Sequence, residues 1–264
     1  MKVYLKTEQM QKITAMAARF IVSRSPLADY LAVHVTIKDN RLTIFAVNPA
    51  RSFVFATIDA LKTDGDFSFA IDGRLFHEAI NTVRGEQMAI TLTNEKCLIG
   101  FMDGSTTLPT MHVTLDTQVR KPENKILDVS VEKLHTALTV AKGAERREIG
   151  TCGMLCQEGK ACVFGSDDAQ AQSVTRLALT ELQPIPEDAT PFNVFYFRHE
   201  HMQRALACCP GEEVTLSVGE GHSLLTSKNA EITVETGFAN EGVGKFPVNQ
   251  FAAMINTQFT TVAV

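Results

Sequence analysis

The sequence has no long hydrophobic run and no pattern typical of an export signal. No apolar stretch approaches the roughly 18 residues that a membrane-spanning helix needs, so we expect no membrane partner. The first residues, MKVYLKTEQMQK, contain an apolar stretch that is too short and too broken for a signal peptide. The six cysteines include no CxxC pair, and without an export signal they predict reduced thiols in the cytoplasm.

Motifs for common catalytic chemistries are also missing. There is no P-loop, no GxGxxG after a strand and no GxSxG. The sequence His199-Glu200-His201 differs from HExxH, and helical spacing does not bring its two histidines onto one face. We therefore predict no catalytic residue, no metal and no cofactor. One enzymatic alternative stays open, because a Cys–His hydrolase that uses Cys97 or His77 needs partners that are adjacent only in space.

The cysteines follow a pattern of their own. Cys152, Cys156 and Cys162 share parity along two expected strands, so we predict that they face one side of a sheet. Cys208 and Cys209 are neighbours in the sequence. The spacing of the cysteines is poor for zinc, and we interpret the thiols as buried and inert.

What the sequence does contain is the composition of a globular protein with a sizeable core. Of its 264 residues, 45% are hydrophobic and 21% are charged, and this length is typical of about two domains. The formal net charge of −5 argues against a protein that binds nucleic acid over its whole surface. A protein whose positive charge is gathered on one face remains possible.

Two stretches of the chain read alike, Met1 to about Thr110 and about Leu127 to Thr236. Each contains a short strand, an amphipathic helix, a strand hairpin, a further strand, and then strand, helix, Gly-Glu turn and hairpin. The repeat predicts an α+β fold made of one duplicated domain, with two helices packed on antiparallel sheets. We place the first domain at 1–110, a polar connector at 111–126, and the second domain at 127–264, including a C-terminal extension at 237–264.

Local signals support this division. Lys38-Asp39-Asn40 is typical of a tight hairpin turn, and Asp72 is a candidate N-cap for the helix that follows. Gly85 and Gly211 fall where a helix should stop. The apolar stripe of the helix after Asp72 is predicted to consist of Leu75, Ala79, Ile80 and Val83.

Cations lie on the predicted helices away from their apolar stripes, whereas acidic residues concentrate in loops and strands. Charged helix faces commonly serve solubility. The alternative is a segregated field, in which basic helices hold a phosphate backbone through many exchangeable contacts without reading bases. The candidate nucleic-acid-binding residues are Lys12, Arg19, Arg24, Arg74, Arg84, Lys133, Lys142, Arg146, Arg147 and Arg204.

Three segments carry a resemblance to a known family: the N-terminal pattern from MKVYLKTEQMQK to LTIFAVN, then FSFAIDGRLFHEAINTVRGEQMAITLTNEKCLI, and GMLCQEGKACVFGSD. They resemble parts of the DNA sliding clamps, the processivity factors of DNA polymerases, and are most similar to the bacterial beta-type clamp. The similarity covers about residues 1–236 and depends on the order of the elements and their repetition, because no single motif is diagnostic.

The resemblance implies a ring of six such domains around duplex DNA, with the helices inside and the sheets outside. A chain with two domains would then form a homotrimer by head-to-tail contact of edge strands. The implied partners are double-stranded DNA, bound without sequence specificity, a DNA polymerase and a clamp loader. A two-domain chain of this kind suggests a phage or another mobile genome.

In the family, partner peptides enter an apolar pocket between adjacent domains of one subunit. Carried over by position, the implied peptide-binding residues are Val47, Pro49, Met111, Val113, Leu115, Phe259, Val262 and Val264. The chain departs from the bacterial pattern at Asp168–Ala171, which replaces a Gly-His-Arg-Leu segment, and at the polar edge segment Met102–Thr107. The second departure motivates an alternative, a clamp-fold protein that does not encircle DNA and acts as a decoy, a monomer or a subunit of a mixed ring.

Overall fold

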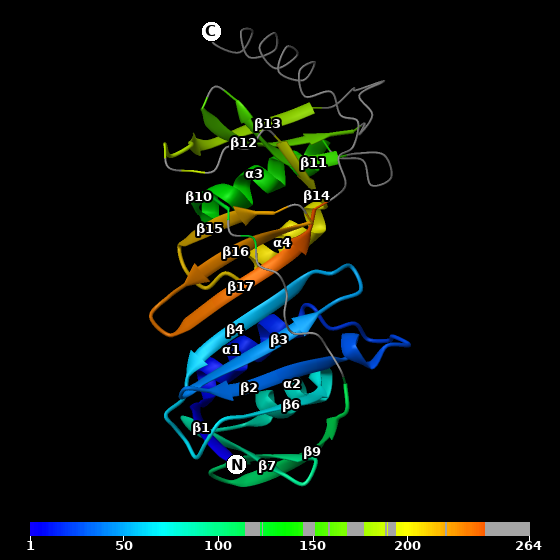
Figure 1. Cartoon of the computed structure of the whole chain (residues 1–264), viewed down its shortest axis with the longest axis vertical. Coiled ribbons are helices and arrows are strands. Elements are labelled where there is room, and N and C mark those ends of the chain that lie inside the picture. The colour runs from blue at the N-terminus through cyan, green and yellow to red at the C-terminus, as the bar shows by residue number, and fades with distance from the viewer. Residues whose placement is uncertain are drawn as a thin grey trace. The chain divides into compact units, whose positions relative to one another are not determined.

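The computed structural model describes residues 1–113, 122, 124–144, 151–157, 159–167, 177–187, 189, 194–219 and 221–240. The first repeat begins with a strand, a helix and a short 3-10 turn, and continues as a run of antiparallel strands interrupted by a second helix (Figure 1). Its elements are β1 (Lys2–Lys6), α1 (Thr7–Ala18), η1 (Ala28–Tyr30), β2 (Ala32–Lys38), β3 (Arg41–Val47), β4 (Phe53–Asp59), β5 (Lys62–Thr63), β6 (Phe67–Asp72), α2 (Gly73–Thr82), β7 (Gln87–Thr93), β8 (Lys96–Phe101) and β9 (Gly104–Met111).

The second repeat has the same order of elements, apart from η1 and β5. Its elements are β10 (Lys125–Ser130), α3 (Val131–Ala144), β11 (Thr151–Gln157), β12 (Lys160–Ser166), β13 (Leu177–Pro184), β14 (Val194–Phe197), α4 (His199–Leu206), β15 (Glu213–Val218), β16 (His222–Lys228) and β17 (Ile232–Ala239). The predicted duplication of one α+β unit with two helices is therefore confirmed for the described residues. No helix within them is long and apolar enough to cross a membrane.

The chain forms two compact units that do not coincide with the two repeats. The first unit comprises residues 1–120, 208–211 and 226–237, and the second comprises 121–207, 212–225 and 238–264. In the first unit the strands follow the order β17-β4-β3-β2-β6-β9-β8-β7-β1-β5. In the second unit β10 pairs with β15, and a separate sheet has the order β13-β12-β11-β14. The division at 110 and 127 remains a prediction about the repeats.

The core of the first unit follows from strand alternation. Val33, Val35 and Ile37 of β2 are buried on one face, whereas the residues between them are more accessible. The matching strands β3, β4 and β17 bury apolar residues on the same face, and the apolar sides of α1 and α2 pack against it. The hairpin between β2 and β3 turns at Asp39 and Asn40, whose φ angles are 51° and 59°, which confirms the predicted tight turn.

The helix α2 begins at the predicted cap. The side chain of Asp72 accepts hydrogen bonds from the backbone N–H groups of Arg74 and Leu75, at 3.0 and 2.9 Å. The predicted apolar stripe was wrong at its first position, because Leu75 is 46% exposed and Phe76 is buried instead. Phe76 lies in line with Ile80 and Val83 at helical spacing, which turns Leu75 toward solvent.

The prediction that three cysteines share one face of a sheet was also wrong. Cys156 pairs with Ala161 and Leu155 pairs with Cys162 across the β11–β12 hairpin. Directly paired residues of an antiparallel hairpin share a face, so Cys162 lies on the opposite face from Cys152 and Cys156. In this hairpin every even-numbered residue pairs with an odd-numbered one. Two residues with even numbers, one on each strand, therefore lie on opposite faces of the sheet.

Close approach of α3 to β12 depends on a glycine in the second unit. A Cβ atom at Gly165 would collide with the backbone of Ala141, in α3, at its oxygen, carbonyl carbon and Cα. Gly143, in the same helix, has open space where a Cβ would lie. Only Gly165 is therefore required for the packing of helix on strand.

We predict that Gly165→Ala destabilises the chain by about 1–3 kcal/mol, because the helix must move to admit the methyl group. The matched variant Gly143→Ala should be neutral or stabilising by up to about 1 kcal/mol, because it removes a helical glycine. Urea unfolding of both variants measures the difference. Equal stabilities would contradict the assigned packing of α3 on β12.

Candidate functional site

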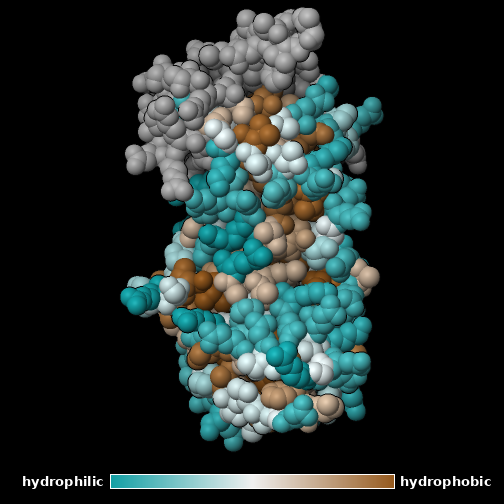
Figure 2. All heavy atoms as spheres, turned by 180° about the vertical axis from the view of Figure 1, so that it is seen from behind, coloured by the Kyte–Doolittle hydropathy of each residue, from teal (hydrophilic) through white to brown (hydrophobic). Residues whose placement is uncertain are grey.

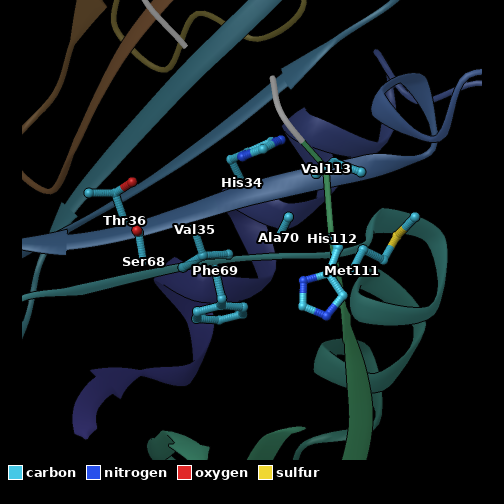
Figure 3. Close-up of a pocket in the computed structure, with 9 residues that line it drawn as sticks. All are labelled: His34, Val35, Thr36, Ser68, Phe69, Ala70, Met111, His112 and Val113. Atoms are coloured by element: carbon cyan, nitrogen blue, oxygen red, sulfur yellow. The ribbon is translucent and has the colours of Figure 1, made fainter. Parts of the chain in front are cut away.

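A groove opens in the first unit where the chain leaves strand β9. β6 pairs with β9 only at Ala70–Met111 and Ile71–Thr110. Beyond Met111 the chain leaves the ladder and runs across β6 and β2 (Figure 3). The resulting cavity of about 340 Å³ is lined by His34, Val35, Thr36, Ser68, Phe69, Ala70, Met111, His112 and Val113.

The floor of this groove is the face of β2 and β6 that points away from the core. His34 pairs with Ala70 and Thr36 pairs with Ser68 across the two strands, so these four side chains share that face. Thr36, Ser68 and Ala70 on this floor are small, and His34 is its one large side chain. His34 also adjoins an aromatic row on β3 and β4: its ring centroid is 6.2 Å from that of Phe45, and Phe45 stacks on Phe55 at 4.5 Å.

Two histidines line the groove in different environments. Nε2 of His34 is buried and has no hydrogen-bond partner among the described residues. Burial lowers the pKa of His34, an effect that Asp29 opposes, so this imidazole is neutral at pH 7. His112 is exposed, and its Nε2 lies 3.2 Å from a carboxylate oxygen of Glu95. The groove is thus lined by one partly buried, neutral ring and by one exposed ring that has a carboxylate beside it, and the two rings point to different sides of the strands (Figure 3).

The structure brings together only part of the predicted peptide site. Met111 and Val113 line the groove, whereas Val47 is half-buried at the end of β3 and Pro49 is exposed in the loop that follows. Leu115, Phe259, Val262 and Val264 lie outside the described residues, as does the Asp168–Ala171 segment. His34, Thr36 and Ser68 were missed, although the alternation of AVHVTIK places His34 and Thr36 together on the face opposite the buried valines.

The candidate DNA-binding cations differ in how they are paired. Lys12 lies 2.7 Å from Glu8 and Arg74 lies 3.1 Å from Glu78, each one helical turn away. Arg204 is half-buried on α4, and Arg146 and Arg147 lie outside the described residues. No ion pair within the described ranges involves the remaining candidates, all of them exposed: Arg19, Arg24, Arg84, Lys133 and Lys142.

Hydrogen bonds join the two helices of the first unit. Nε2 of Gln11, in α1, donates to the backbone oxygens of Ile80 and Val83 at 3.4 Å. Oγ1 of Thr14 lies 3.4 Å from Nδ1 of His77, in α2. Figure 2 shows that hydrophilic residues occupy much of the surface seen from behind, where hydrophobic residues form separate patches. Arg19 and Arg84, beside the C-terminal ends of α1 and α2, are exposed.

Residues that could support catalysis are poorly placed for it. Burial raises the pKa of the Cys97 and Cys209 thiols to about 12 and that of Cys162 to about 11, so these thiols stay protonated at neutral pH. His77 is tied to Thr14 and to Asn81 on the helix surface. Among the described residues no group of His, Cys, Asp and Glu side chains could hold a metal ion.

The His199-Glu200-His201 motif has a structural explanation. His199 begins α4 and is buried, its ring lies near the backbone of Leu138 in α3, and its Nε2 has no hydrogen-bond partner among the described residues. Burial lowers the pKa of His199, and the nearby Lys142 lowers it further. The first histidine of the motif is therefore a buried residue where α4 packs against α3.

Comparison with solved structures identifies the fold. The beta subunit of DNA polymerase III from Thermotoga maritima superimposes with a TM-score of 0.73 and 18% identity over 90% of this chain and 64% of that one. The beta subunit from Streptococcus pyogenes superimposes with a TM-score of 0.77 and 10% sequence identity, over 92% of this chain and 65% of that one. A Helicobacter pylori beta clamp bound to a DNA ligase peptide superimposes with a TM-score of 0.69 and 16% sequence identity, over 92% of this chain and 67% of that one.

These likenesses confirm that the chain has the fold of the bacterial beta sliding clamps, as its sequence resemblance predicted. The chain spans about 64% of the length of the Thermotoga protein and 65% of the Streptococcus protein. No family model and no curated protein matches the sequence. The likeness is therefore one of fold, carried by the element order of the two repeats.

The buried His199 predicts an acid-sensitive second unit. Its folded-state pKa is lowered, so below the unfolded value of about 6.5 the unfolded chain binds the extra proton and folding stability falls. We expect His199→Gln to reduce the loss of stability between pH 7.5 and 5.5, by less than about 1.4 kcal/mol per pH unit. Urea unfolding at both pH values measures this, with the exposed His112→Gln as control. An unchanged pH dependence in His199→Gln would contradict the assignment.

Proposed function

We propose that this protein is a DNA sliding clamp, which encircles duplex DNA and tethers a replicative polymerase without any chemistry of its own. The observation that carries the proposal is the duplicated strand–helix unit with the beta-clamp fold. The high pKa values of the buried thiols agree with a role that is not enzymatic. The pattern of exposed cations on the helices supports contact with DNA.

In this function the helix cations hold the phosphate backbone weakly and without sequence preference. Exposed lysine and arginine side chains contact phosphates by exchanging with counterions, and such contacts let a protein move along DNA. Lys12 and Arg74 already neutralise Glu8 and Glu78, so they contribute less than cations with no carboxylate beside them. Arg19, Arg24, Arg84, Lys133 and Lys142 are the contacts on which the proposal chiefly depends.

The edge strands support assembly of three copies into a ring of six repeats. Within the first unit, β17, the last strand of the second repeat, pairs with β4 of the first repeat over Ile232–Gly237. By position in the repeats, β9 corresponds to β17, and β13 corresponds to β4. Among the described residues β13 is an edge of its four-stranded sheet, and β9 pairs with β6 at only two residues. We propose that β9 of one copy pairs with β13 of the next, as β17 pairs with β4.

The groove beside Met111 is the proposed docking place for partner peptides from the polymerase and the clamp loader. It lies where residues 111–113 cross the sheet, at the start of the expected connector. Its size is within the usual range of about 300–1,000 Å³ for ligand pockets. The remaining residues carried over from the family, Val47, Pro49, Leu115, Phe259, Val262 and Val264, stay predictions.

The second candidate function is a clamp-fold protein that does not encircle DNA. The observation that favours it is the polar composition of Gly104–Thr107, in the half of β9 that the ring requires as an interface. Strand pairing relies on backbone hydrogen bonds, but side-chain burial adds most of the stability of a subunit interface. A chain that stays monomeric at high concentration would belong to this class.

The charge contacts can be tested with two double variants of equal net charge. We expect Arg19→Ala with Arg84→Ala to weaken binding to a short duplex and to lower the slope of log K against log salt by about 1.8, because two phosphate contacts are lost. Lys12→Ala with Arg74→Ala should have a smaller effect, because those cations are paired. Fluorescence anisotropy over a salt series measures both slopes. An unchanged slope in Arg19→Ala with Arg84→Ala would contradict DNA contact by these helices.

The ring can be tested by closing it covalently. A cysteine at Leu179 of β13 is combined in turn with a cysteine at Ser105, Thr106 or Thr107 of β9. We expect light scattering to give three times the chain mass, and one of these pairs to give a cross-linked trimer on mild oxidation. The control is each variant that carries only one of the two introduced cysteines, and it should yield no cross-linked trimer.

Oxidation in the presence of nicked circular DNA then tests encirclement. A closed ring is linked topologically, so it should remain on circular DNA in high salt and leave when a restriction enzyme cuts the circle. Release by salt alone would refute encirclement. A stable monomer with no cross-linking would favour the second candidate function.

A further inference from the structure

His34 is the one side chain of the groove whose hydrogen-bonding capacity is buried and unmet by the described residues. Its Nε2 has no partner among them, while its ring rests against Phe45. A buried ring nitrogen without a hydrogen bond carries a desolvation penalty, so a group that binds it gains more than it would in water. His34 lines the cavity (Figure 3), and an occupant must turn its ring to reach the buried nitrogen.

The strand next to His34 also has unused backbone groups. β6 is paired with β2 along Phe67–Asp72, but on its other side only Ala70 and Ile71 pair with β9. Residues Phe67–Phe69 therefore have no strand partner on that side in the described structure. An extended peptide satisfies such an edge, and the small side chains Ser68 and Ala70 leave room for its backbone.

We propose that the groove takes an extended peptide that donates a hydrogen bond to Nε2 of neutral His34, so that peptide binding is lost on acidification. This inference rests on the proposed partner-docking function and adds a specificity-determining and pH-sensing residue to it. The donor can be a backbone N–H, an amide or a hydroxyl group of the peptide. Protonation of His34 replaces the acceptor by a second N–H and places a charge against Phe45.

The charged and titratable groups around His34 define the pH dependence. Burial lowers the pKa of His34, and Asp29, in η1, raises it in part. His112 lines the same cavity from the end of β9, and its ring has Glu95 beside it. β3 contributes the uncharged Phe45, and β6 contributes Ser68 and Ala70. His112 is thus the second imidazole whose titration must be separated from that of His34.

The test uses 12-residue peptides selected on the intact chain from a phage-displayed random library at pH 7.5. Counter-selection against Ser68→Arg, which fills the groove from an exposed strand position, keeps only peptides that bind there. We expect the selected peptides to bind His34→Phe about tenfold more weakly, because the ring shape is kept and the acceptor is lost. His34→Gln retains an acceptor and should recover part of the affinity.

The pH profile separates a hydrogen-bonding role from a packing role. Binding to the wild-type chain should weaken by about tenfold between pH 7.5 and 5.5, and both His34 variants should lose this dependence. His112→Gln should keep it, and His135→Gln, on α3 of the second unit, is the control for a histidine that does not line the groove. Circular dichroism and urea unfolding confirm that the variants are folded.

The outcomes distinguish this inference from the function on which it rests. If no Ser68-dependent peptide can be selected, the groove is not a peptide site, and both proposals are overturned. If peptides bind but His34→Phe binds them as well as the wild-type chain, solvent already satisfies Nε2, and the inference about His34 alone is overturned. If the pH dependence follows His112→Gln instead, His112 is the sensor, and the assignment to His34 is again wrong.

Discussion

The backbone edge of β4 is the constraint on which the first unit depends. An edge strand with unpaired N–H and C=O groups is a template for pairing with another chain. Here β17 covers that edge from Phe53 to Ile58, and Oγ1 of Thr236 donates to the backbone oxygen of Phe53 at 3.0 Å. Ile232 and Val234 then enter the same core as α1 and α2. A strand from late in the chain therefore completes a unit that begins at the first residue.

This arrangement has a consequence for folding and for assembly. Contacts between β4 and β17 are separated by about 180 residues, so the first unit cannot be completed until nearly all of the chain is present. The close fit of Gly237 against the ring of Phe53 adds shape specificity to the backbone ladder. The same need for a covering strand applies to β13, which is an edge of its own sheet in the described part of the chain. The edge of β4 is covered by β17 of the same chain, whereas the equivalent edge of β13 is not covered by any described strand. This difference is a physical reason for one copy of the chain to pair with another.

Local features of the sequence were sufficient to predict most elements but not their partners. The N-cap at Asp72 and the turn at Asp39 depend on neighbouring residues only, and both were predicted correctly. Cys162 was assigned to the wrong face because its face depends on the register of a hairpin, which no single strand contains. The pairing of β17 with β4 was missed for the same reason, since it joins the two repeats.

The candidate site shows the same limit. Met111 and Val113 were expected from a family resemblance, yet the residues that form the floor of the groove could be found only once β2 and β6 were known to be neighbours. The alternation within β2 puts His34 and Thr36 on one face, but it does not reveal that Ser68 and Ala70 lie beside them. A site formed across strands therefore needs the register as well as the pattern.

The distribution of charge fits the proposed role, which does not require a high affinity for DNA. A chain with a net charge of −5 cannot hold DNA through its whole surface, and two of its candidate cations are already paired with glutamates. For a protein that acts by tight binding this would be a weakness. For a ring it is an advantage, because topology prevents dissociation while weak phosphate contacts allow sliding. Retention then depends on the strand edges that close the ring, and tethering depends on the effective concentration of a partner held beside the DNA.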